Sequence, residues 1–261
     1  ACIQICAKNN IEDNVKKIIG FFYESINKKA DFILTPENSQ IISINKKELF
    51  HKASFFQKDK LLKETKKICK KFKKWILLGS IIIKNKSNKL VNRSVLINPK
   101  GLIETYYDKI HMFDVQLSNK EKYLESKIYK PGNKIKTARL PWGKIGLTIC
   151  YDMRFPNMYR AMAKAGIKFI SVPSAFTKTT GKKHWHTLLK ARAIENFCYI
   201  FAPAQIGKHN KKRETYGHSL IISPDGKILN EKKKGEGVIY FNIDYRLPNE
   251  LRKRIPSLLL N

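Results

Sequence analysis

Three side chains that could act together on a substrate each accompany a short apolar segment. They are the thiol of Cys150, the carboxylate of Glu37 and the ammonium of Lys109. The apolar segments are residues 144–150, 32–35 and 102–107. In open α/β sheets, functional groups gather at the carboxyl ends of strands, so we expect these side chains to meet in one cleft.

This combination of groups suits the hydrolysis of an amide. Glu37 would take the thiol proton, Cys150 would attack the carbonyl carbon, and Lys109 would stabilise the thiolate and the oxyanion. Ammonia would leave with a proton from Glu37, and water activated by Glu37 would then release the acid from a thioester. This cycle calls for a Glu37 pKa raised toward neutrality by partial burial, and a helix N-terminus after Cys150 would favour the thiolate. No metal and no organic cofactor enters the scheme.

Each residue also has a purely structural interpretation when it is taken alone. Cys150 could end a buried strand, Glu37 could cap a helix, and Lys109 could be one more solvated lysine in a lysine-rich chain. The complementary chemistry of the three favours the catalytic interpretation.

In this chain order, the three residues resemble the Glu–Lys–Cys triad of the nitrilase-like, or carbon–nitrogen hydrolase, superfamily. The resemblance runs from the Ile3-Gln4 segment to Arg252-Lys253-Arg254-Ile255-Pro256. It implies that Glu37 is the general base, Lys109 the third member and Cys150 the nucleophile. Many members carry a second glutamate after the lysine.

Glu125, in Leu124-Glu125-Ser126, matches that second glutamate, and Glu121 is the near alternative. The resemblance implies that Glu125 orients Lys109 and helps to place the substrate amide. It also implies an α/β fold, an αββα sandwich of mixed sheets flanked by helices. Residues 1–261 would form one carbon–nitrogen hydrolase domain, which pairs into an αββα–αββα homodimer or a higher homo-oligomer.

Further motifs in the C-terminal half resemble the deaminated glutathione amidase branch of the superfamily. The implied activity is cysteine-dependent hydrolysis of the non-peptide amide of deaminated glutathione, a metabolite-repair reaction that would release ammonia. The branch of ω-amidases, which act on 2-oxoglutaramate and 2-oxosuccinamate, is the alternative. The motifs are Pro173-Ser174-Ala175-Phe176-Thr177, Thr180-Gly181, His184-Trp185, Ala191-Arg192-Ala193-Ile194-Glu195, Ala204-Gln205-Ile206-Gly207-Lys208-His209, Arg213 and Tyr216-Gly217-His218-Ser219.

The ω-amidases share the Thr-Thr-Gly and His-Trp elements but typically lack the Gln-x-Gly-x-His segment. Some positions depart from the pattern of the superfamily. His186 and Asn157 stand where members usually have glutamate, and Lys182 and Lys183 replace small residues or proline. These departures bear on the identity of the substrate rather than on the triad.

Several residues near the triad are candidates for binding a small anionic amide. The Tyr151 backbone N–H is a second oxyanion donor, and Arg154 either holds a substrate carboxylate or pairs with Asp152 or Glu195. Thr179 and Thr180 either contact the substrate or cap a helix. The full set of candidates is Tyr151, Arg154, Phe176, Thr179 and Thr180.

The charge of the chain raises a rival hypothesis. Lys and Arg number 52 against 21 Asp and Glu, a formal net charge of +31, which is typical of nucleic-acid-binding proteins. The basic residues are spread out, with short runs at residues 70–74, 211–213 and 232–234, and no stacking platform accompanies them. We therefore place a nucleic-acid-binding protein on a hydrolase-like scaffold behind the enzyme. Steering of an anionic substrate is the favoured role for the charge.

Composition gives three further expectations. Five cysteines without framework spacing predict free thiols in a reducing compartment, and we expect a cytoplasmic protein. No apolar run is long enough for a membrane span, and residues 1–7 have a strand pattern rather than that of a signal peptide. His184-x-His186 could hint at a metal, but no third ligand has suitable spacing, so we expect no metal site.

Hydrophobic periodicity and turn residues predict alternating strands and helices. Asn10 is expected to cap the first helix, and Pro224-Asp225-Gly226 to turn a hairpin. Residues 110–133 are expected to be a loop over the site. The expected helices are residues 11–29, 58–74, 156–165, 184–197 and a short basic one at the end. The expected strands are residues 1–7, 32–35, 75–84, 90–97, 102–107, 144–150, 167–172, 198–204, 220–222, 227–230 and 237–243.

Overall fold

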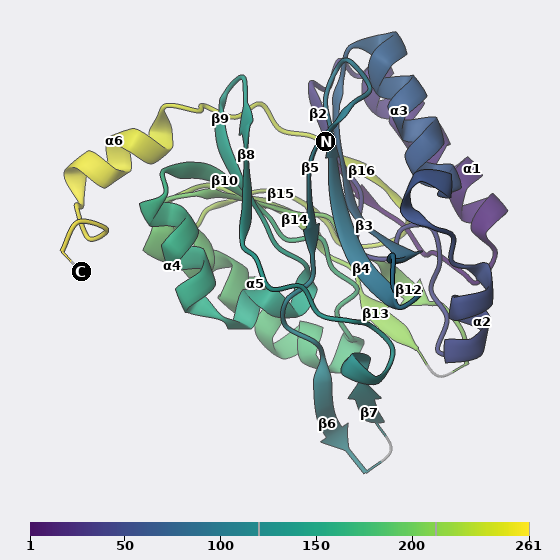
Figure 1. Ribbon diagram of the computed structural model, residues 1–261. Helices are drawn as coiled ribbons and strands as arrows, with labels where there is room; N and C mark the ends of the chain where they lie inside the picture. Colours follow the sequence, from purple (N-terminus) through teal and green to yellow (C-terminus); the bar gives the residue numbers. More distant parts are fainter. Residues whose placement is uncertain (120, 212, 261) are drawn as a thin grey trace.

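The computed structural model describes residues 1–119, 121–211 and 213–260. Within them, most of the strands form two six-stranded sheets that pack face to face (Figure 1). The first sheet has the order β16 (Gly237–Ile239), β1 (Cys2–Gln4), β2 (Phe32–Leu34), β3 (Trp75–Lys84), β4 (Leu90–Ile97), β5 (Ile103–Asp108). The second has the order β15 (Ile228–Lys232), β14 (Ser219–Ile222), β11 (Tyr199–Ala202), β10 (Ile167–Ser171), β9 (Gly143–Leu147), β8 (Lys136–Leu140).

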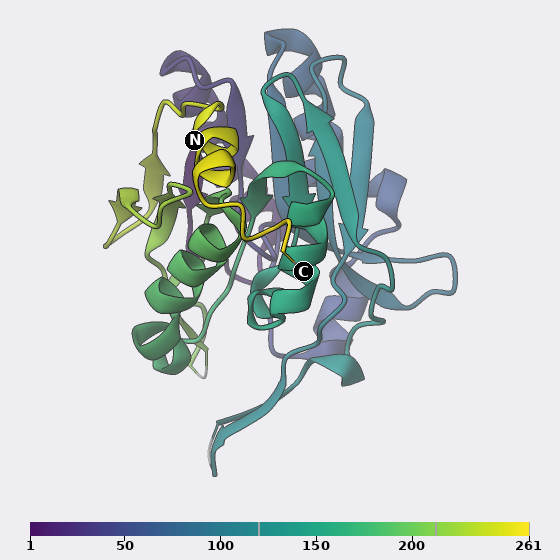
Figure 2. The same ribbon diagram turned by 90° about the vertical axis from the view of Figure 1, so that its left-hand side faces the viewer.

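Helices cover the outer face of each sheet, which gives the expected αββα layers. Helices α1 (Ile11–Asn27) and α3 (Lys60–Phe72) cover the first sheet, and α4 (Pro156–Lys164) and α5 (Lys178–Asn196) cover the second (Figures 1 and 2). Both sheets are mixed. The central pairs β1–β2–β3 and β9–β10–β11 are parallel, and the outer pairs are antiparallel.

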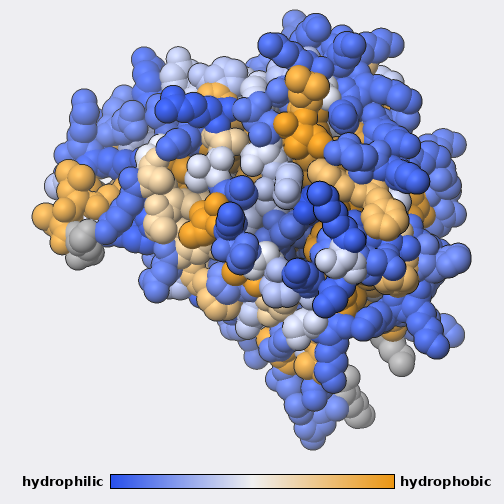
Figure 3. Space-filling model, in the orientation of Figure 1, coloured by the Kyte–Doolittle hydropathy of each residue, from blue (hydrophilic) through white to orange (hydrophobic). Residues whose placement is uncertain are grey.

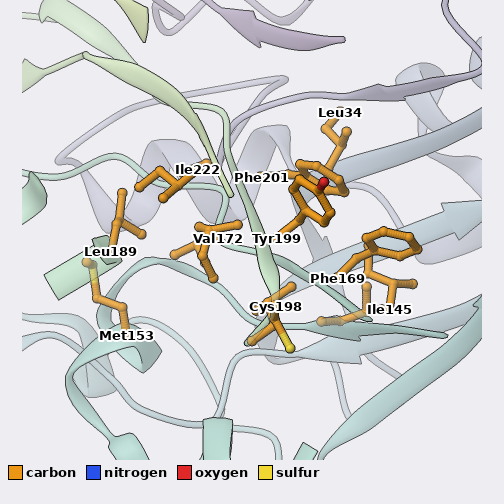
Figure 4. Close-up of a cluster of buried hydrophobic side chains, with 14 of the residues drawn as sticks. Leu34, Ile145, Met153, Phe169, Val172, Leu189, Cys198, Tyr199, Phe201 and Ile222 are labelled. Carbon is orange, nitrogen blue, oxygen red and sulfur yellow. The ribbon is translucent and has the colours of Figure 1, made fainter. Parts of the chain in front are cut away.

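Strand β3 shows how the sequence builds this layering. Apart from Gly79, Ser80 and the terminal Lys84, its residues are apolar, as is typical of a strand buried on both faces. Leu77 packs in the core between the sheets, whereas Ile76 and Leu78 pack toward α1 and α3. The core between the sheets also holds Phe169 and Phe201, whose stacked rings lie 5.8 Å apart (Figure 4).

Local signals account for several boundaries. The side chain of Asn10 accepts hydrogen bonds from the backbone N–H of Glu12 and Asp13, at 2.9 and 3.3 Å, as predicted for the cap of α1. The predicted hairpin joins β14 to β15 through a turn in which Gly226 has a φ of 85°. Only glycine adopts this conformation without strain.

Several expectations about the elements differ from the structure. Residues 110–133 contain a hairpin, β6 (Asp114–Ser118) and β7 (Glu121–Leu124), which extends away from the two sheets (Figure 2). The edge strand β8 was not predicted. Helix α5 begins at Lys178 rather than at residue 184, because the Thr177 side chain accepts a hydrogen bond from the Thr180 N–H. The strand before Cys150, expected over residues 144–150, is β9 and ends at Leu147.

The remaining elements are short, and none of the described helices has the length and apolar character needed to cross a bilayer. Lys212, in the second of the basic runs, lies outside the described residues. The short elements are α2 (Lys46–Lys52), β12 (Ile206–Lys208), β13 (Glu214–Tyr216) and α6 (Leu247–Arg254).

Candidate active site

Cys150 lies in a tight turn between β9 and α4. It has a φ of 50° and begins a 3-10 helix, Cys150–Arg154. Its N–H donates to the Pro173 carbonyl at 2.9 Å, and the Asp152 carboxylate accepts the Ile149 N–H at 2.8 Å and the Tyr107 hydroxyl at 2.7 Å. A non-glycine residue at positive φ is strained, and such strain persists only where surrounding bonds hold it.

Glu37 follows β2 and is completely enclosed by hydrogen-bond donors. Its Oε1 accepts from Lys109 Nζ and from Asn92 Nδ2, each at 2.9 Å, and its Oε2 accepts from the Ala175 N–H at 2.8 Å. The Cys150 thiol lines the same cavity as this carboxylate, and the two groups shift each other's pKa. Glu37 therefore lies beside the thiol while it is bonded to the ammonium, with donors from β4 and from the segment after β10.

Gly79 on β3 permits the turn that carries Glu37. A Cβ at Gly79 would lie 1.9 Å from the Thr35 carbonyl oxygen and 2.7 Å from the Pro36 carbonyl oxygen. It would also lie 2.5 Å from the Pro173 side chain, in the segment that bonds the Cys150 N–H. Only a residue without a side chain allows this close approach of backbone segments.

Lys109 follows β5 and bridges two carboxylates. Its Nζ lies 2.9 and 2.8 Å from the two oxygens of Glu125, in addition to its contact with Glu37. The Phe113 N–H holds Glu125 Oε2 at 2.6 Å. Glu121, the alternative from the sequence, instead accepts the hydroxyls of Tyr123 and Thr179, at 3.2 and 3.1 Å.

The electrostatics of this cluster correct two expectations. Burial raises the pKa of Glu37, but the charge and hydrogen bond of Lys109 and the bond from Cys150 outweigh it and lower the pKa overall. Burial and the Glu37 charge raise the pKa of the Cys150 thiol, so a helix N-terminus does not make it a thiolate. Burial opposes the charge of Lys109, but the two glutamates raise its pKa well above the ordinary value. Before substrate binds, Cys150 is thus a thiol beside the Glu37 carboxylate, and Lys109 carries a positive charge.

These four side chains line one cavity of about 530 Å³ between the ends of the two sheets. Of the five candidates for substrate binding, Phe176 and Thr180 line it, whereas Tyr151, Arg154 and Thr179 are not among its described lining residues. The Tyr151 N–H donates to no backbone carbonyl in the described part of the chain. Much of the remaining wall is apolar, with contributions from Ile41, Ile42, Ile44, Ile82, Phe113 and Ile128.

Arg154 takes neither of the ion pairs considered for it among the described residues. Its guanidinium lies 3.1 Å from His184 Nδ1 and 5.4 Å from the Phe176 ring. Asp152 instead bonds His111 Nδ1 at 2.7 Å, and Glu195 bonds Arg192, three residues earlier on α5, at 2.8 Å.

Two residues of the site region were not predicted to act there. Arg213 lines the cavity, although the sequence offered it only as a marker of the family branch. Gln205 donates to the Glu37 carbonyl at 2.9 Å and accepts the Ala7 N–H at 2.9 Å, so it holds the backbone of the catalytic turn. The sequence feature that could have pointed to Gln205 is its place in the Gln-x-Gly-x-His segment.

The structure gives His186 partners that the sequence did not indicate. Glu231 Oε1 lies 2.9 Å from His186 Nε2 and 2.6 Å from His218 Nδ1. Within the described residues, these three side chains form a group whose ligand atoms could hold a metal ion, all within 4.8 Å of one another. His184, the neighbour considered from the sequence, is not part of it. Hydrogen bonds between the histidines and Glu231 suffice to explain the grouping.

Comparison with known proteins agrees with this fold. Residues 1–253 match the family model described as carbon-nitrogen hydrolase, so the chain belongs to that family. The chain is 35% identical over 264 residues to the deaminated glutathione amidase of Yersinia enterocolitica, covering 100% of this chain and 92% of that protein. It is 37% identical over 261 residues to the deaminated glutathione amidase of Dictyostelium discoideum, covering 97% and 90%.

Solved structures of the superfamily are similar as well. Saccharomyces cerevisiae Nit3, a member of branch 10 of the nitrilase superfamily, superimposes with a TM-score of 0.87 at 26% identity, covering 98% of this chain and 93% of that chain. The Caenorhabditis elegans NitFhit protein gives a TM-score of 0.88 at 32% identity, covering 100% of this chain and 63% of that chain.

Proposed function

We propose that the chain is an amidohydrolase that cleaves deaminated glutathione through a thioester on Cys150. The observation that carries this proposal is the position of Glu37, which is bonded to the Lys109 ammonium and lines the same cavity as the Cys150 thiol, whose pKa its charge raises. A nucleophile, a base and a fixed cation in mutual contact are the groups that acyl transfer requires.

The resting protonation states suit the first step. Glu37 is a carboxylate and takes the thiol proton as Sγ bonds to the amide carbon, which avoids a free thiolate in a buried site. The oxyanion that forms is stabilised by the Lys109 ammonium and by the backbone N–H of Tyr151, the residue after the nucleophile. The Glu37 proton then passes to the amide nitrogen as the C–N bond breaks. Water loses a proton to Glu37, attacks the thioester carbon, and restores the thiol.

The chemistry of deaminated glutathione corrects the leaving group expected from the sequence. Its scissile amide joins an oxo-dicarboxylic acid to the amine of cysteinylglycine. Hydrolysis therefore yields 2-oxoglutarate and cysteinylglycine, not ammonia. Ammonia is the leaving group for 2-oxoglutaramate, so the nitrogen product separates the two candidate substrates.

Two features support an anionic substrate of this size. Relatives at 35% and 37% identity over almost the whole chain are deaminated glutathione amidases. The cavity of about 530 Å³ has Lys122, Lys127 and Arg213 in its wall besides the paired Lys109. A positively charged cavity entrance raises the rate at which an anionic substrate encounters the site.

The test measures 2-oxoglutarate, ammonia and cysteinylglycine after incubation with deaminated glutathione or 2-oxoglutaramate. We expect 2-oxoglutarate and cysteinylglycine from the first substrate, and no product with the Cys150→Ala variant. Faster turnover of 2-oxoglutaramate with ammonia release would make the chain an ω-amidase. A folded protein that hydrolyses neither substrate would contradict the proposal and favour the basic binding protein.

Assembly and location belong to the same proposal. We propose a homodimer, because apolar side chains are exposed on α5 and beyond α6, at Ile194, Ile255, Leu259 and Leu260. Figure 3 shows apolar side chains gathered at the C-terminal end of a mostly hydrophilic face. Light scattering on the purified protein measures the mass. The five free cysteines support a reducing, cytoplasmic environment.

A further inference from the structure

Arg213 is held in the wall of the catalytic cavity by contacts that do not use its charge. It lies just before β13, where its N–H donates to Asn210 Oδ1 at 3.0 Å and its carbonyl accepts the His209 N–H at 2.9 Å. Its Nη2 donates to the Ala175 carbonyl at 3.1 Å, and its guanidinium lies 5.5 Å from the centre of the Tyr123 ring. These contacts fix the orientation of the guanidinium.

One donor of this guanidinium is buried and unused. Arg213 Nε is shielded from solvent and finds no hydrogen-bond partner in the part of the chain that the structure describes. Leaving a charged donor buried without a partner costs free energy, and such groups are rare in folded proteins. Arg213 also has no ion-pair partner among the described residues, and it lines the cavity, so a ligand there can meet the charge of the part of the guanidinium that faces the cavity.

The charges around Arg213 indicate what that ligand is. In the catalytic cluster, Lys109 is already paired with Glu37 and Glu125. Arg213 is separated from the Glu37 carboxylate by Ala175, whose N–H bonds Glu37 and whose carbonyl bonds Arg213. A rigidly held guanidinium without an ion-pair partner among the described residues matches a carboxylate, which accepts two parallel hydrogen bonds.

We propose that Arg213 anchors a carboxylate-binding subsite in the catalytic cavity and so selects amides that carry a carboxylate. This inference rests on the proposed function. Deaminated glutathione offers two such groups, the oxo-acid carboxylate and the glycine carboxylate. Tyr123, on β7, supports the face of the guanidinium, so the hairpin β6–β7 contributes to the subsite.

The test compares Arg213→Met with the matched control Arg246→Met, whose side chain is exposed. For deaminated glutathione, we expect Arg213→Met to raise KM about 10- to 100-fold while kcat stays within about 3-fold. Hydrolysis of an uncharged short amide should not change. Arg213→Lys should recover only part of the loss, because an ammonium cannot form the two parallel bonds.

Two further substrates identify the carboxylate. If Arg213 binds the oxo-acid end, Arg213→Met also raises KM for 2-oxoglutaramate. If it binds the glycine end, 2-oxoglutaramate is unaffected, and the glycinamide analogue of deaminated glutathione is a poor substrate that is insensitive to Arg213→Met. Either result supports the subsite. An unchanged KM for every anionic amide, or an equal loss on the uncharged amide, would overturn it.

Binding to the inactive protein separates this inference from the proposed function. Calorimetry with deaminated glutathione and Cys150→Ala measures the subsite without turnover. Loss of its binding in Cys150→Ala/Arg213→Met would support the subsite even if the wild-type protein proved not to hydrolyse deaminated glutathione. Equal binding by both variants would contradict it.

Discussion

Glu125 holds the ammonium of Lys109 with both of its carboxylate oxygens, at 2.9 and 2.8 Å, while Lys109 reaches Glu37 on its other side. Lys109 is almost completely buried, so its charge depends on these two glutamates. Removing one of them leaves an imperfectly balanced ion inside the protein.

Glu125→Gln should therefore weaken catalysis through Lys109. We expect kcat to fall about 10- to 1000-fold, because the ammonium loses a partner that fixes its position. The Glu125 charge raises the pKa of Lys109, so its removal lowers that pKa, and the alkaline decline of kcat should move to lower pH. Glu64→Gln, in α3 and paired there with Lys67, is the control. If the alkaline decline of kcat occurs at the same pH in Glu125→Gln as in the wild-type protein, the proposed role of Glu125 is contradicted.

Glu37→Gln should remove the general base while it leaves the Cys150 nucleophile in place. We expect kcat/KM to fall about 10²- to 10⁴-fold, the usual effect of losing a general base. The Glu37 charge raises the pKa of Cys150, so the thiol pKa should fall in the variant. Thiolate absorbance during a pH titration, with Cys150→Ala as the blank, measures this pKa. A wild-type thiolate present at neutral pH would be inconsistent with the account.

Gly79→Ala should displace the turn that carries Glu37. The added methyl group would meet the Thr35 carbonyl oxygen at 1.9 Å, so backbone must move. We expect a loss of unfolding free energy of about 3 kcal/mol or more, with loss of activity in any folded fraction. Gly20→Ala in α1 is the matched control. Its Cβ meets nothing within 4 Å, and it should stabilise by about 0.5–1 kcal/mol. Equal melting temperatures for the two variants would refute the prediction.

His209 should make stability fall in mildly acidic solution. Burial lowers its pKa from 6.5 to about 4, and its ring bonds the Ala7 carbonyl and the Thr215 hydroxyl. Between those pH values the unfolded chain binds a proton that the folded chain does not, so unfolding free energy decreases as pH falls through this window. The loss should be roughly 3 kcal/mol for this residue.

Urea denaturation at a series of pH values measures that effect. His209→Gln should flatten the curve between the two pKa values, whereas substitution of the exposed His51 should leave its slope unchanged. A wild-type curve as flat as that of His209→Gln would count against a neutral, buried His209.

Strong apolar patterns made much of the fold predictable. Strands β3 and β4 match the predicted residues 75–84 and 90–97, because both are long and almost entirely buried. The hairpin β6–β7 and the edge strand β8 were missed because their side chains are largely polar and partly exposed. Such strands show little of the periodicity by which buried strands are recognised.

The site was predictable in its chemistry but not in its electrostatics. The family pattern led to Glu37, Lys109, Cys150 and Glu125, and all four line one cavity. Their pKa directions depend on burial and on donors from distant segments, such as the Asn92 amide and the Ala175 N–H. Arg213 was missed as a cavity residue for the same reason, since its unused Nε is visible only in three dimensions.

The central claim is that Cys150 carries the acyl group during turnover. Rapid acid quenching of the protein with deaminated glutathione, followed by peptide mass spectrometry, tests it directly. We predict that the Cys150 peptide gains the mass of a 2-oxoglutaryl thioester, which hydroxylamine removes and which Cys150→Ala lacks. Turnover at the wild-type rate by Cys150→Ala, or acylation at another residue with Cys150 unmodified, would contradict the account.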